Sequence, residues 1–189
     1  MQLDKEIWAR IGNSDQEAYT TVYIYYYRRL YNYGKKFTNN ELLIEDTIQE
    51  VLMEIWKTRN RLSSVEFPVT YFYSSFRYLL FRNLRADQKI VNVEPEDEGV
   101  FSIDHFIIIG ENDTLLKEKL NKSIAGLTSR QREAIFLRFY EGLSYQEVAE
   151  VMNITVKATY KIMARALQEM KDNLTLPLIL LFLFQQLFY

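Results

Sequence analysis

Apolar residues recur at three- and four-residue spacing along most of this chain, which is the pattern of amphipathic helices. In the first half, helices are predicted over 3–11, 14–37, 41–57 and 70–85. The third of them has a well-defined stripe that should be buried, formed by Ile44, Ile48, Val51, Leu52 and Ile55. The pattern predicts an all-α protein.

Several helix starts carry the spacing of a capping box, a hydroxyl followed three positions later by a carboxylate or amide. The pairs are Ser14 with Glu17, Thr128 with Gln131, and Ser144 with Glu147. Gly142 lies where a helix from 128 must end and the chain reverse. Residues 127–171 therefore predict one helix, a glycine turn, and two further helices separated by a turn at 152–154, with Thr155 capping the last.

The last of these helices has two different faces. One stripe is predicted to pack on the other two helices, and it contains Val156, Tyr160, Met163, Leu167 and Met170. The opposite face carries Lys157, Ala158, Lys161 and Arg165. Cations can meet phosphates, and a small residue lets the backbone approach base edges in the major groove. The simpler alternative is a solvated three-helix core whose basic face binds nothing. The two capping boxes and the aligned cations together favour DNA binding.

Residues 127–167 resemble the promoter-reading domain of bacterial sigma factors of the extracytoplasmic-function group, within the sigma-70 family. The matching features are the Leu-Thr start, Glu-Gly-Leu-Ser-Tyr at 141–145, Glu-Val-Ala at 147–149, Thr-Val-Lys at 155–157, and Arg-Ala-Leu at 165–167. This domain type also occurs in other bacterial regulators, such as response regulators. Only the N-terminal half of the chain can therefore distinguish a sigma factor from them. The candidate duplex-binding residues are Ser144, Tyr145, Thr155, Lys157, Ala158, Thr159, Lys161 and Arg165.

The helix over 41–57 has a polar face that also carries a methionine and a tryptophan. An ordinary solvated face is the simpler interpretation. The stretch 44–56, however, resembles the most diagnostic helix of the sigma family, in which Asp, Gln-Glu-Val and a closing Trp recur. In that family this helix docks on the clamp coiled coil of RNA polymerase. The resemblance implies that the polymerase-facing residues are Asp46, Gln49, Glu50, Met53 and Trp56.

Aromatic and basic residues alternate through the loop from 59 and along the helix over 70–85. Bases of a single strand can stack on rings while cations hold the phosphates. We expect Phe72, Ser75, Phe76, Leu79 and Leu80 to be buried, and Tyr73 and Arg77 to be exposed. In the sigma family this segment melts the minus-ten element; Tyr71-Phe72-Tyr73 and Arg77 match its pattern, and Tyr78 departs from it. The resemblance implies strand contacts by Arg59, Arg61, Ser63, Ser64, Tyr71, Tyr73, Ser74 and Arg77.

Charge is distributed unevenly along the chain, whose net charge is −2. Residues 86–113 have a net charge of −7, whereas the flanking 1–85 and 114–189 have +2 and +3. The acidic run 94–98 should be extended, and Phe101, Ile103 and 106–109 are too apolar for a free tether. In the sigma family the corresponding segment threads the polymerase channel. If this linker does the same, neutralising 94–98 should alter initiation, and unchanged transcripts would contradict the idea.

The residues 173–189 form a hydrophobic tail that the resemblance does not explain. Its apolar run is shorter than the ~20 residues needed to span a bilayer, so membrane insertion is the weaker expectation. Exposed Leu and Phe tend to aggregate unless they dock. We expect the tail to bind an anti-sigma factor, an accessory recruiter or the polymerase, or to pack on its own chain. Unaffected solubility, binding and transcription after deletion of 175–189 would exclude this.

Composition argues against several other classes of protein. The chain has no cysteine and one histidine, His105, which excludes disulfides and thiolate metal sites. The sequence contains no Gly-rich phosphate-binding loop and no catalytic constellation. We therefore expect that the protein is not an enzyme and that it binds no cofactor and no metal. The N-terminus lacks a secretory signal, and we expect a cytoplasmic, nucleoid-associated protein.

The predicted architecture has two small helical domains, a sigma region 2 bundle and a sigma region 4 helix-turn-helix, joined by an acidic extended linker. The boundaries are 1–86, 87–113 for the linker, 114–172, and 173–189 for the tail. The predicted function is a transcription initiation factor whose partners are core RNA polymerase and promoter DNA. A DNA-binding regulator that does not dock polymerase is one alternative, and a sigma-like regulatory protein recruited through its tail is the other.

Overall fold

All regular structure in the described part of the chain is helical. The computed structural model describes residues 5–64, 68–87, 101–102 and 121–173. The chain divides into two compact units, Met1–Glu98 and Gly99–Tyr189, which we describe separately. The all-α prediction is confirmed. The division falls inside the predicted linker, while the finer domain boundaries stay a prediction.

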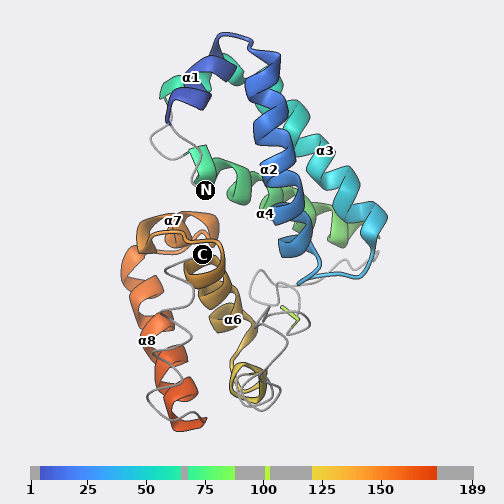
Figure 1. The fold of residues 1–189 in the computed structure, drawn as a ribbon. Helices are drawn as coiled ribbons and strands as arrows, with labels where there is room; N and C mark the ends of the chain where they lie inside the picture. Colours follow the sequence, from blue (N-terminus) through green and yellow to red (C-terminus); the bar gives the residue numbers. More distant parts are fainter. Residues whose placement is uncertain (1–4, 65–67, 88–100, 103–120, 174–189) are drawn as a thin grey trace, which may run out of the picture. The chain divides into compact units, whose positions relative to one another are not determined.

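The described residues of the N-terminal unit form four α-helices and one short 3-10 helix (Figure 1). The elements are α1 (Lys5–Gly12), α2 (Gln16–Gly34), α3 (Glu41–Lys57), η1 (Arg59–Ser64) and α4 (Pro68–Asp87). Helices α2, α3 and α4 pack against one another, and α1 packs on α2 and η1. The predicted stripe of α3 is confirmed, because all five of its residues are buried.

Aromatic rings form much of the core of this unit. The ring of Tyr26 stacks on that of Phe72 with their centroids 4.3 Å apart. The ring of Trp8 also contacts that of Phe72, with centroids 5.5 Å apart. Tyr33 contacts Tyr73 at 5.6 Å. Rings of this size bury a large apolar area and prefer such stacked or tilted arrangements, so they fix α1, α2 and α4 around one centre.

The start of α2 differs from the capping box predicted at Ser14. Asp15 is the N-cap, and its carboxylate accepts hydrogen bonds from the backbone N–H groups of Glu17 at 2.9 Å and Ala18 at 3.1 Å. Ser14 instead adopts a left-handed backbone conformation with φ of 65°. The Ala18 hydrogen bond, followed by that from Arg10, lowers the pKa of Asp15. The predicted helix was right, but its cap lies one residue later, since Asp and Ser cap helices about equally well.

Gly34, the last residue of α2, lies closely against α3 and α4. A Cβ atom here would lie 2.9 Å from Cγ2 of Ile44 and 3.0 Å from Cζ of Phe76, both fully buried side chains. We expect Gly34→Ala to lower the free energy of unfolding, because overpacking costs about 1–3 kcal/mol and exceeds the roughly 1 kcal/mol gain in helix propensity. Urea or thermal denaturation measures this change.

Gly126→Ala is the matched control for this substitution. Its added Cβ would meet its nearest neighbour, the Ser123 carbonyl oxygen, at an ordinary 3.6 Å. We therefore expect this variant to unfold like the wild type. Equal stability of the two variants would contradict the close packing described for Gly34.

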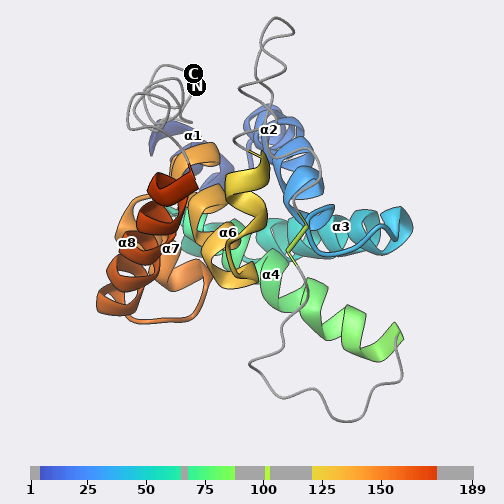
Figure 2. The same cartoon turned by 90° about the horizontal axis from the view of Figure 1, so that it is seen from below.

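The C-terminal unit contains a helix-turn-helix built from three helices. Residues 121–125 are helical and lead to α6 (Ser129–Ile135), which continues as a π-helical turn, η2 (Phe136–Tyr140). Then follow α7 (Tyr145–Val151) and α8 (Val156–Asn173). Both α6 and α7 pack on α8 (Figure 2).

The caps and turns predicted for this unit are confirmed. Thr128 with Gln131 and Ser144 with Glu147 each form a complete capping box. The Oγ1 of Thr155 accepts from the backbone N–H of Ala158 at 3.1 Å, so it caps α8. Gly142 has φ of 76°, a left-handed conformation that glycine adopts without steric cost. Local chemistry therefore sets the ends of these helices.

Phe101 connects the predicted linker to the C-terminal unit. Its side chain is fully buried, and its ring lies 5.7 Å from that of Phe136. The expectation that apolar linker residues lie against a surface is therefore confirmed at this position. The acidic run 94–98, the apolar run 106–109 and the tail 173–189 fall outside the residues whose side chains are described.

Two kinds of feature are absent from the described residues. No helix there has both the length and the apolar character required to cross a bilayer. Nor does any cluster of three or more His, Asp or Glu side chains in these ranges form a candidate metal site.

Candidate functional site

The face of α3 that points away from the core carries the residues predicted to bind polymerase. Asp46, Gln49 and Glu50 are exposed, and Met53 is 59% exposed. Trp56 is half-buried at the C-terminal end of the same helix. The helix thus presents polar side chains over its middle and apolar side chains toward its end. An exposed methionine beside an aromatic ring is typical of protein-binding surfaces.

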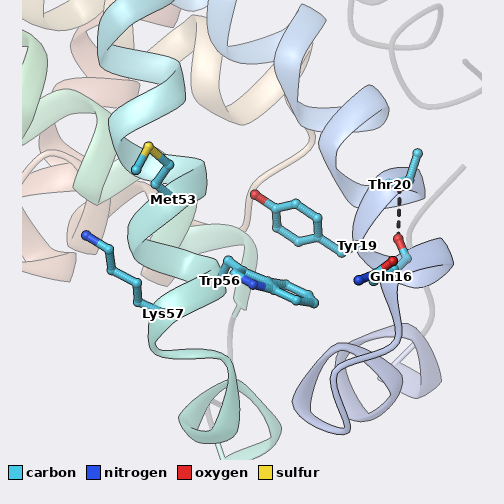
Figure 3. Close-up of a pocket in the computed structure, with 6 residues that line it drawn as sticks. All are labelled: Gln16, Tyr19, Thr20, Met53, Trp56 and Lys57. Atoms are coloured by element: carbon cyan, nitrogen blue, oxygen red, sulfur yellow. Dashed lines mark hydrogen bonds between the residues drawn. The ribbon is translucent and has the colours of Figure 1, made fainter.

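Trp56 forms one wall of a surface pocket between the end of α3 and the start of α2 (Figure 3). The pocket has a volume of about 410 Å³ and is lined by Gln16, Tyr19, Thr20, Met53, Trp56 and Lys57. The Trp56 ring contacts the Tyr19 ring at 4.8 Å. The guanidinium of Arg59 lies 4.6 Å from the centre of the same indole. Trp56 is therefore held in place on two sides and presents a fixed apolar surface.

Tyr19 supports this pocket and was not among the predicted site residues. Its hydroxyl donates to the Leu52 carbonyl oxygen at 2.9 Å, and burial raises the pKa of this hydroxyl. The residue stays a neutral donor at physiological pH. Tyr19 belongs to a series of aromatic residues at three- and four-residue spacing along α2, a pattern that predicts a core position, so its half-buried location at the helix start had no separate signal.

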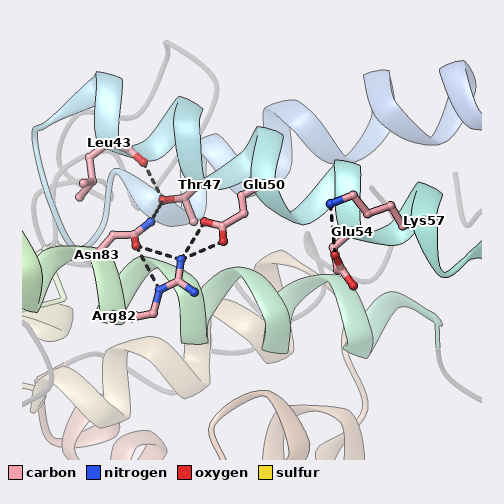
Figure 4. Close-up of polar contacts among 7 residues, drawn as sticks. All are labelled: Leu43, Thr47, Glu50, Glu54, Lys57, Arg82 and Asn83. Atoms are coloured by element: carbon pink, nitrogen blue, oxygen red, sulfur yellow. Dashed lines mark hydrogen bonds and ion pairs between the residues drawn. The ribbon is translucent and has the colours of Figure 1, made fainter.

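An ion pair joins the exposed face of α3 to α4 (Figure 4). The Nη2 atom of Arg82 lies 2.8 Å from one Glu50 carboxylate oxygen and 2.9 Å from the other. Beside it, the Asn83 amide donates to Thr47 Oγ1 at 3.2 Å. A pair this exposed contributes only about 0–1 kcal/mol, so its main effect is to orient Glu50 and Arg82. Glu50 remains accessible.

Two of the residues predicted to contact the minus-ten strand are buried in the core. Tyr73 is 1% exposed and packs on Tyr33, and Arg77 is 7% exposed with its guanidinium 4.9 Å from the Phe81 ring centre. The expectation that these two side chains face solvent is wrong. Helix α4 contacts both α2 and α3, so its buried face is wider than one stripe. Conversely, Ser75 and Leu79, expected to be buried, are half-buried.

The other predicted strand contacts are in different situations. Arg59 is bonded internally, donating to the Trp56 carbonyl and the Ser14 hydroxyl, while Arg61 is exposed. Tyr71 and Ser74 are half-buried on α4. Ser63 and Ser64 lie in η1, but their side chains fall outside the description. The outward stripe of α4 continues through Tyr78, which is 70% exposed, and the exposed Arg82 and Arg85.

The basic face predicted on α8 is present. Lys157, Lys161 and Arg165 are all exposed at helical spacing, and Ala158 is half-buried beside them. Ser144 and Thr155 are exposed at the starts of α7 and α8, where their hydroxyl oxygens are occupied as caps. A helix-turn-helix with such a face can place α8 in a major groove, where cations meet phosphates.

The buried stripe of α8 is rotated from the predicted one. Val156 is 41% exposed and Tyr160 is 56% exposed, whereas Thr159 is fully buried. The stripe that packs on α6 and α7 is instead formed by Thr159, Met163, Ala166 and Met170. Thr159 therefore cannot contact DNA, and its Oγ1 donates to the Thr155 carbonyl oxygen at 3.3 Å. Tyr160, which was assigned to the core, lies on the exposed side.

Tyr160 and Tyr145 meet on the exposed side of the helix-turn-helix. Their rings are stacked, with centroids 4.4 Å apart and planes inclined by 8°. Tyr145 was predicted as a duplex contact, but Tyr160 was missed. The alternative stripe through Thr159, Met163, Ala166 and Met170 has the same three- and four-residue spacing as the predicted one, so the spacing alone gave no signal that Tyr160 is exposed.

Two family models match the chain. The model described as Sigma-70 region 2 matches residues 22–90, which span α2 to α4. The model described as Sigma-70, region 4 matches residues 117–170, which include the helix-turn-helix. The predicted polymerase-facing residues of α3 lie within the first matched range, and the exposed cations of α8 lie within the second.

Proteins named as sigma factors are similar to this chain over most of their length. The ECF RNA polymerase sigma factor SigK of Mycobacterium tuberculosis is 22% identical over 175 residues, covering 87% of this chain and 90% of SigK. The RNA polymerase sigma-H factor of Pseudomonas aeruginosa is 23% identical over 187 residues, covering 93% and 95%. A solved structure of CnrH in complex with the cytosolic domain of CnrY shares the fold, with a TM-score of 0.50, 16% identity, and coverage of 89% and 95%. The chain therefore belongs to the sigma-70 family, in its extracytoplasmic-function group, and is a transcription initiation factor that directs RNA polymerase to promoters.

Proposed function

We propose that the exposed face of α3 binds core RNA polymerase while α8 enters the major groove of the minus-thirty-five element. On α3, Asp46, Gln49 and Glu50 supply polar contacts, and Met53 with Trp56 supplies the apolar anchor. On α8, the cations Lys157, Lys161 and Arg165 meet phosphates on either side of the groove. Ser144 and Tyr145, at the start of α7, and Thr155 with Ala158 lie along the same surface.

Handling of the minus-ten strand is assigned to the outward stripe of η1 and α4. Arg61, Tyr71, Ser74 and Tyr78 lie on or near this stripe, followed by Arg82 and Arg85. Exposed rings can stack on unpaired bases, and arginines beside them can hold the phosphates. Tyr73 and Arg77 act from the core by supporting the helix that carries these groups.

The observation that carries the proposal is the presence in one chain of a helix-turn-helix with aligned exposed cations and of an exposed apolar anchor on α3. The test is reconstitution of the full chain with purified bacterial core RNA polymerase and a library of genomic DNA fragments. We expect transcripts from a limited set of start sites that appear only when the chain is added. Stable co-elution of the chain with core enzyme is expected in the same preparation.

Two different results would favour the alternatives. DNA binding without any association with core polymerase would indicate a helix-turn-helix regulator that does not dock. Association with polymerase that yields no transcripts would indicate a sigma-like regulatory protein. The first outcome would contradict the proposed role of α3 in polymerase docking, and the second would contradict a role in transcription initiation.

A regulatory protein is a further partner in this proposal. The solved CnrH structure is a complex with the cytosolic domain of CnrY, and by analogy we propose that an anti-sigma factor binds this chain. The apolar tail 173–189 is a candidate for contacting either this partner or an accessory recruiter. Work on promoters would place the protein in the cytoplasm at the nucleoid.

A further inference from the structure

Two stacked tyrosines, Tyr145 and Tyr160, lie on the helix-turn-helix. The proposed phosphate contacts of the lysines and the arginine give this pair no role. The pair joins the first residue of α7 to the second turn of α8. Its ring centroids are 4.4 Å apart with planes only 8° from parallel. Tyr160 nevertheless keeps 56% of its surface exposed. A large apolar group is therefore displayed on the outside of the domain.

The pair is held from behind by Arg138. The guanidinium lies 5.3 Å from the centre of the Tyr145 ring, and its Nη1 atom donates to the Leu143 carbonyl oxygen at 2.9 Å. That carbonyl belongs to the turn that precedes α7. The Tyr145 ring is thus held between the Arg138 guanidinium and the Tyr160 ring. The Tyr160 ring that stacks on it is therefore already positioned before any ligand binds. Preorganised aromatic groups lose little conformational entropy on binding.

The position of the pair along α8 places it beside the proposed phosphate contacts. Lys157 and Lys161, both exposed, are three residues before and one residue after Tyr160. Ala164, one turn further on, is exposed and small. Side chains of a helix lean toward its N-terminus, so the Tyr160 ring covers the start of α8. This end of a recognition helix is the part that approaches base edges.

The chemistry of the pair matches one group on the major-groove edge of duplex DNA. Bases within a duplex are stacked on one another, so a protein reaches their edges and not their faces. Of the four bases, only thymine presents an apolar group there, its C5-methyl. Lysine and arginine contact phosphates or guanine and gain nothing from a methyl group. An exposed ring has an apolar surface on which a methyl can be buried.

We propose that the Tyr145–Tyr160 pair reads thymine methyl groups in the major groove of the minus-thirty-five duplex. The inference rests on the proposed function of α8 and adds the base chemistry that α8 prefers. Tyr160 makes the contact, and Tyr145 positions its ring. Promoters of this factor carry thymine at one or two fixed positions next to the bases that α8 faces.

The experiment uses the full chain bound to core RNA polymerase. Duplexes with a randomised upstream element are selected by this complex, and the enriched sequence is then synthesised with each thymine replaced in turn by deoxyuridine. Deoxyuridine pairs like thymine but lacks the C5-methyl. We expect an affinity loss of roughly fourfold for each methyl that the pair contacts, at one or two positions only.

The same scan with variants assigns the effect to the pair. The quantity compared is the affinity for the thymine duplex divided by the affinity for the duplex with deoxyuridine at one of those positions. This ratio should fall to one in Tyr160→Ala, whereas Tyr160→Phe, which keeps the ring, should retain the wild-type ratio. Tyr145→Ala should reduce the ratio. Because each ratio is taken within one variant, a smaller folded fraction cancels.

Failure of this inference and failure of the proposed function give different results. An enriched upstream element that tolerates deoxyuridine at every position would overturn the thymine contact while α8 still reads the duplex. Equal sensitivity in the wild type and Tyr160→Ala would overturn it as well. No enriched upstream element at all, with transcription unaffected by changes on α8, would overturn the role of α8 itself.

Discussion

Replacing Met53 with aspartate is expected to weaken binding of the full chain to core RNA polymerase at least tenfold and to abolish transcription in reconstitution. Met53 is 59% exposed on α3 and lines the pocket beside Trp56. A carboxylate in the centre of an apolar contact must be desolvated, and buried interface anchors of this kind contribute about 2 kcal/mol or more. Because the side chain points to solvent, the fold should be unaffected. Affinity is measured by titrating labelled chain with core enzyme.

Ile24→Asp is the matched control for the docking surface. Ile24 is 67% exposed on α2, so the substitution also places a carboxylate at an exposed apolar position of the same unit. We expect this variant to bind polymerase and to transcribe like the wild type. If Met53→Asp bound as well as Ile24→Asp, the assignment of the α3 face to polymerase docking would be wrong.

Replacing Lys157, Lys161 and Arg165 together with alanine is expected to lower promoter affinity and to flatten its salt dependence. Each phosphate contact releases condensed counterions, so each lost cation should reduce the slope of log affinity against log salt by about 0.9. All three side chains are exposed on α8, and alanine favours helix, so folding should be retained. The measurement is holoenzyme binding to promoter DNA over a range of potassium chloride concentrations.

A second triple variant separates local contacts from overall charge. Lys122 and Arg130 are exposed cations that precede α7, and Lys171 lies in the last turn of α8, far along the helix from the end that approaches the bases. Their replacement by alanine changes the net charge equally. We expect the salt slope of this control to stay near that of the wild type. Equal slopes for the two triple variants would show that α8 makes no direct phosphate contacts.

Local sequence chemistry was sufficient where a helix end depends on a few neighbouring residues. The bounds of α3, both capping boxes of the C-terminal unit and the turn at Gly142 were predicted because caps and left-handed turns are formed by adjacent backbone groups. The errors of this kind were at α2, where Asp15 and Ser14 were both good caps and the helix ends at Gly34 instead of 37, and at 59–64, which was predicted as a loop but forms η1. The α3 stripe was also predictable, since a single set of branched apolar residues fits the helical period.

The family motifs were likewise readable from the sequence. Residues 44–56 and 127–167 carry them, and the matched models cover both stretches. The pocket at Trp56 was not readable, because Tyr19 reaches it from α2 across 33 residues to contact the Leu52 carbonyl. The pairing of Glu50 with Arg82 likewise joins two helices far apart in sequence.

The sequence by itself determined that the regular structure of the described residues is helical, where most of these helices begin and end, and which family the chain belongs to. Only the tertiary structure decided which face of α8 is buried, since stripes through Val156 and Tyr160 or through Thr159 and Ala166 share Met163 and Met170 and both fit a period of 3.6 residues. It also decided that Tyr73 and Arg77 are buried, because α4 packs on two helices at once. Periodicity defines a stripe along one helix, but the number and direction of its neighbours depend on contacts that are distant in sequence.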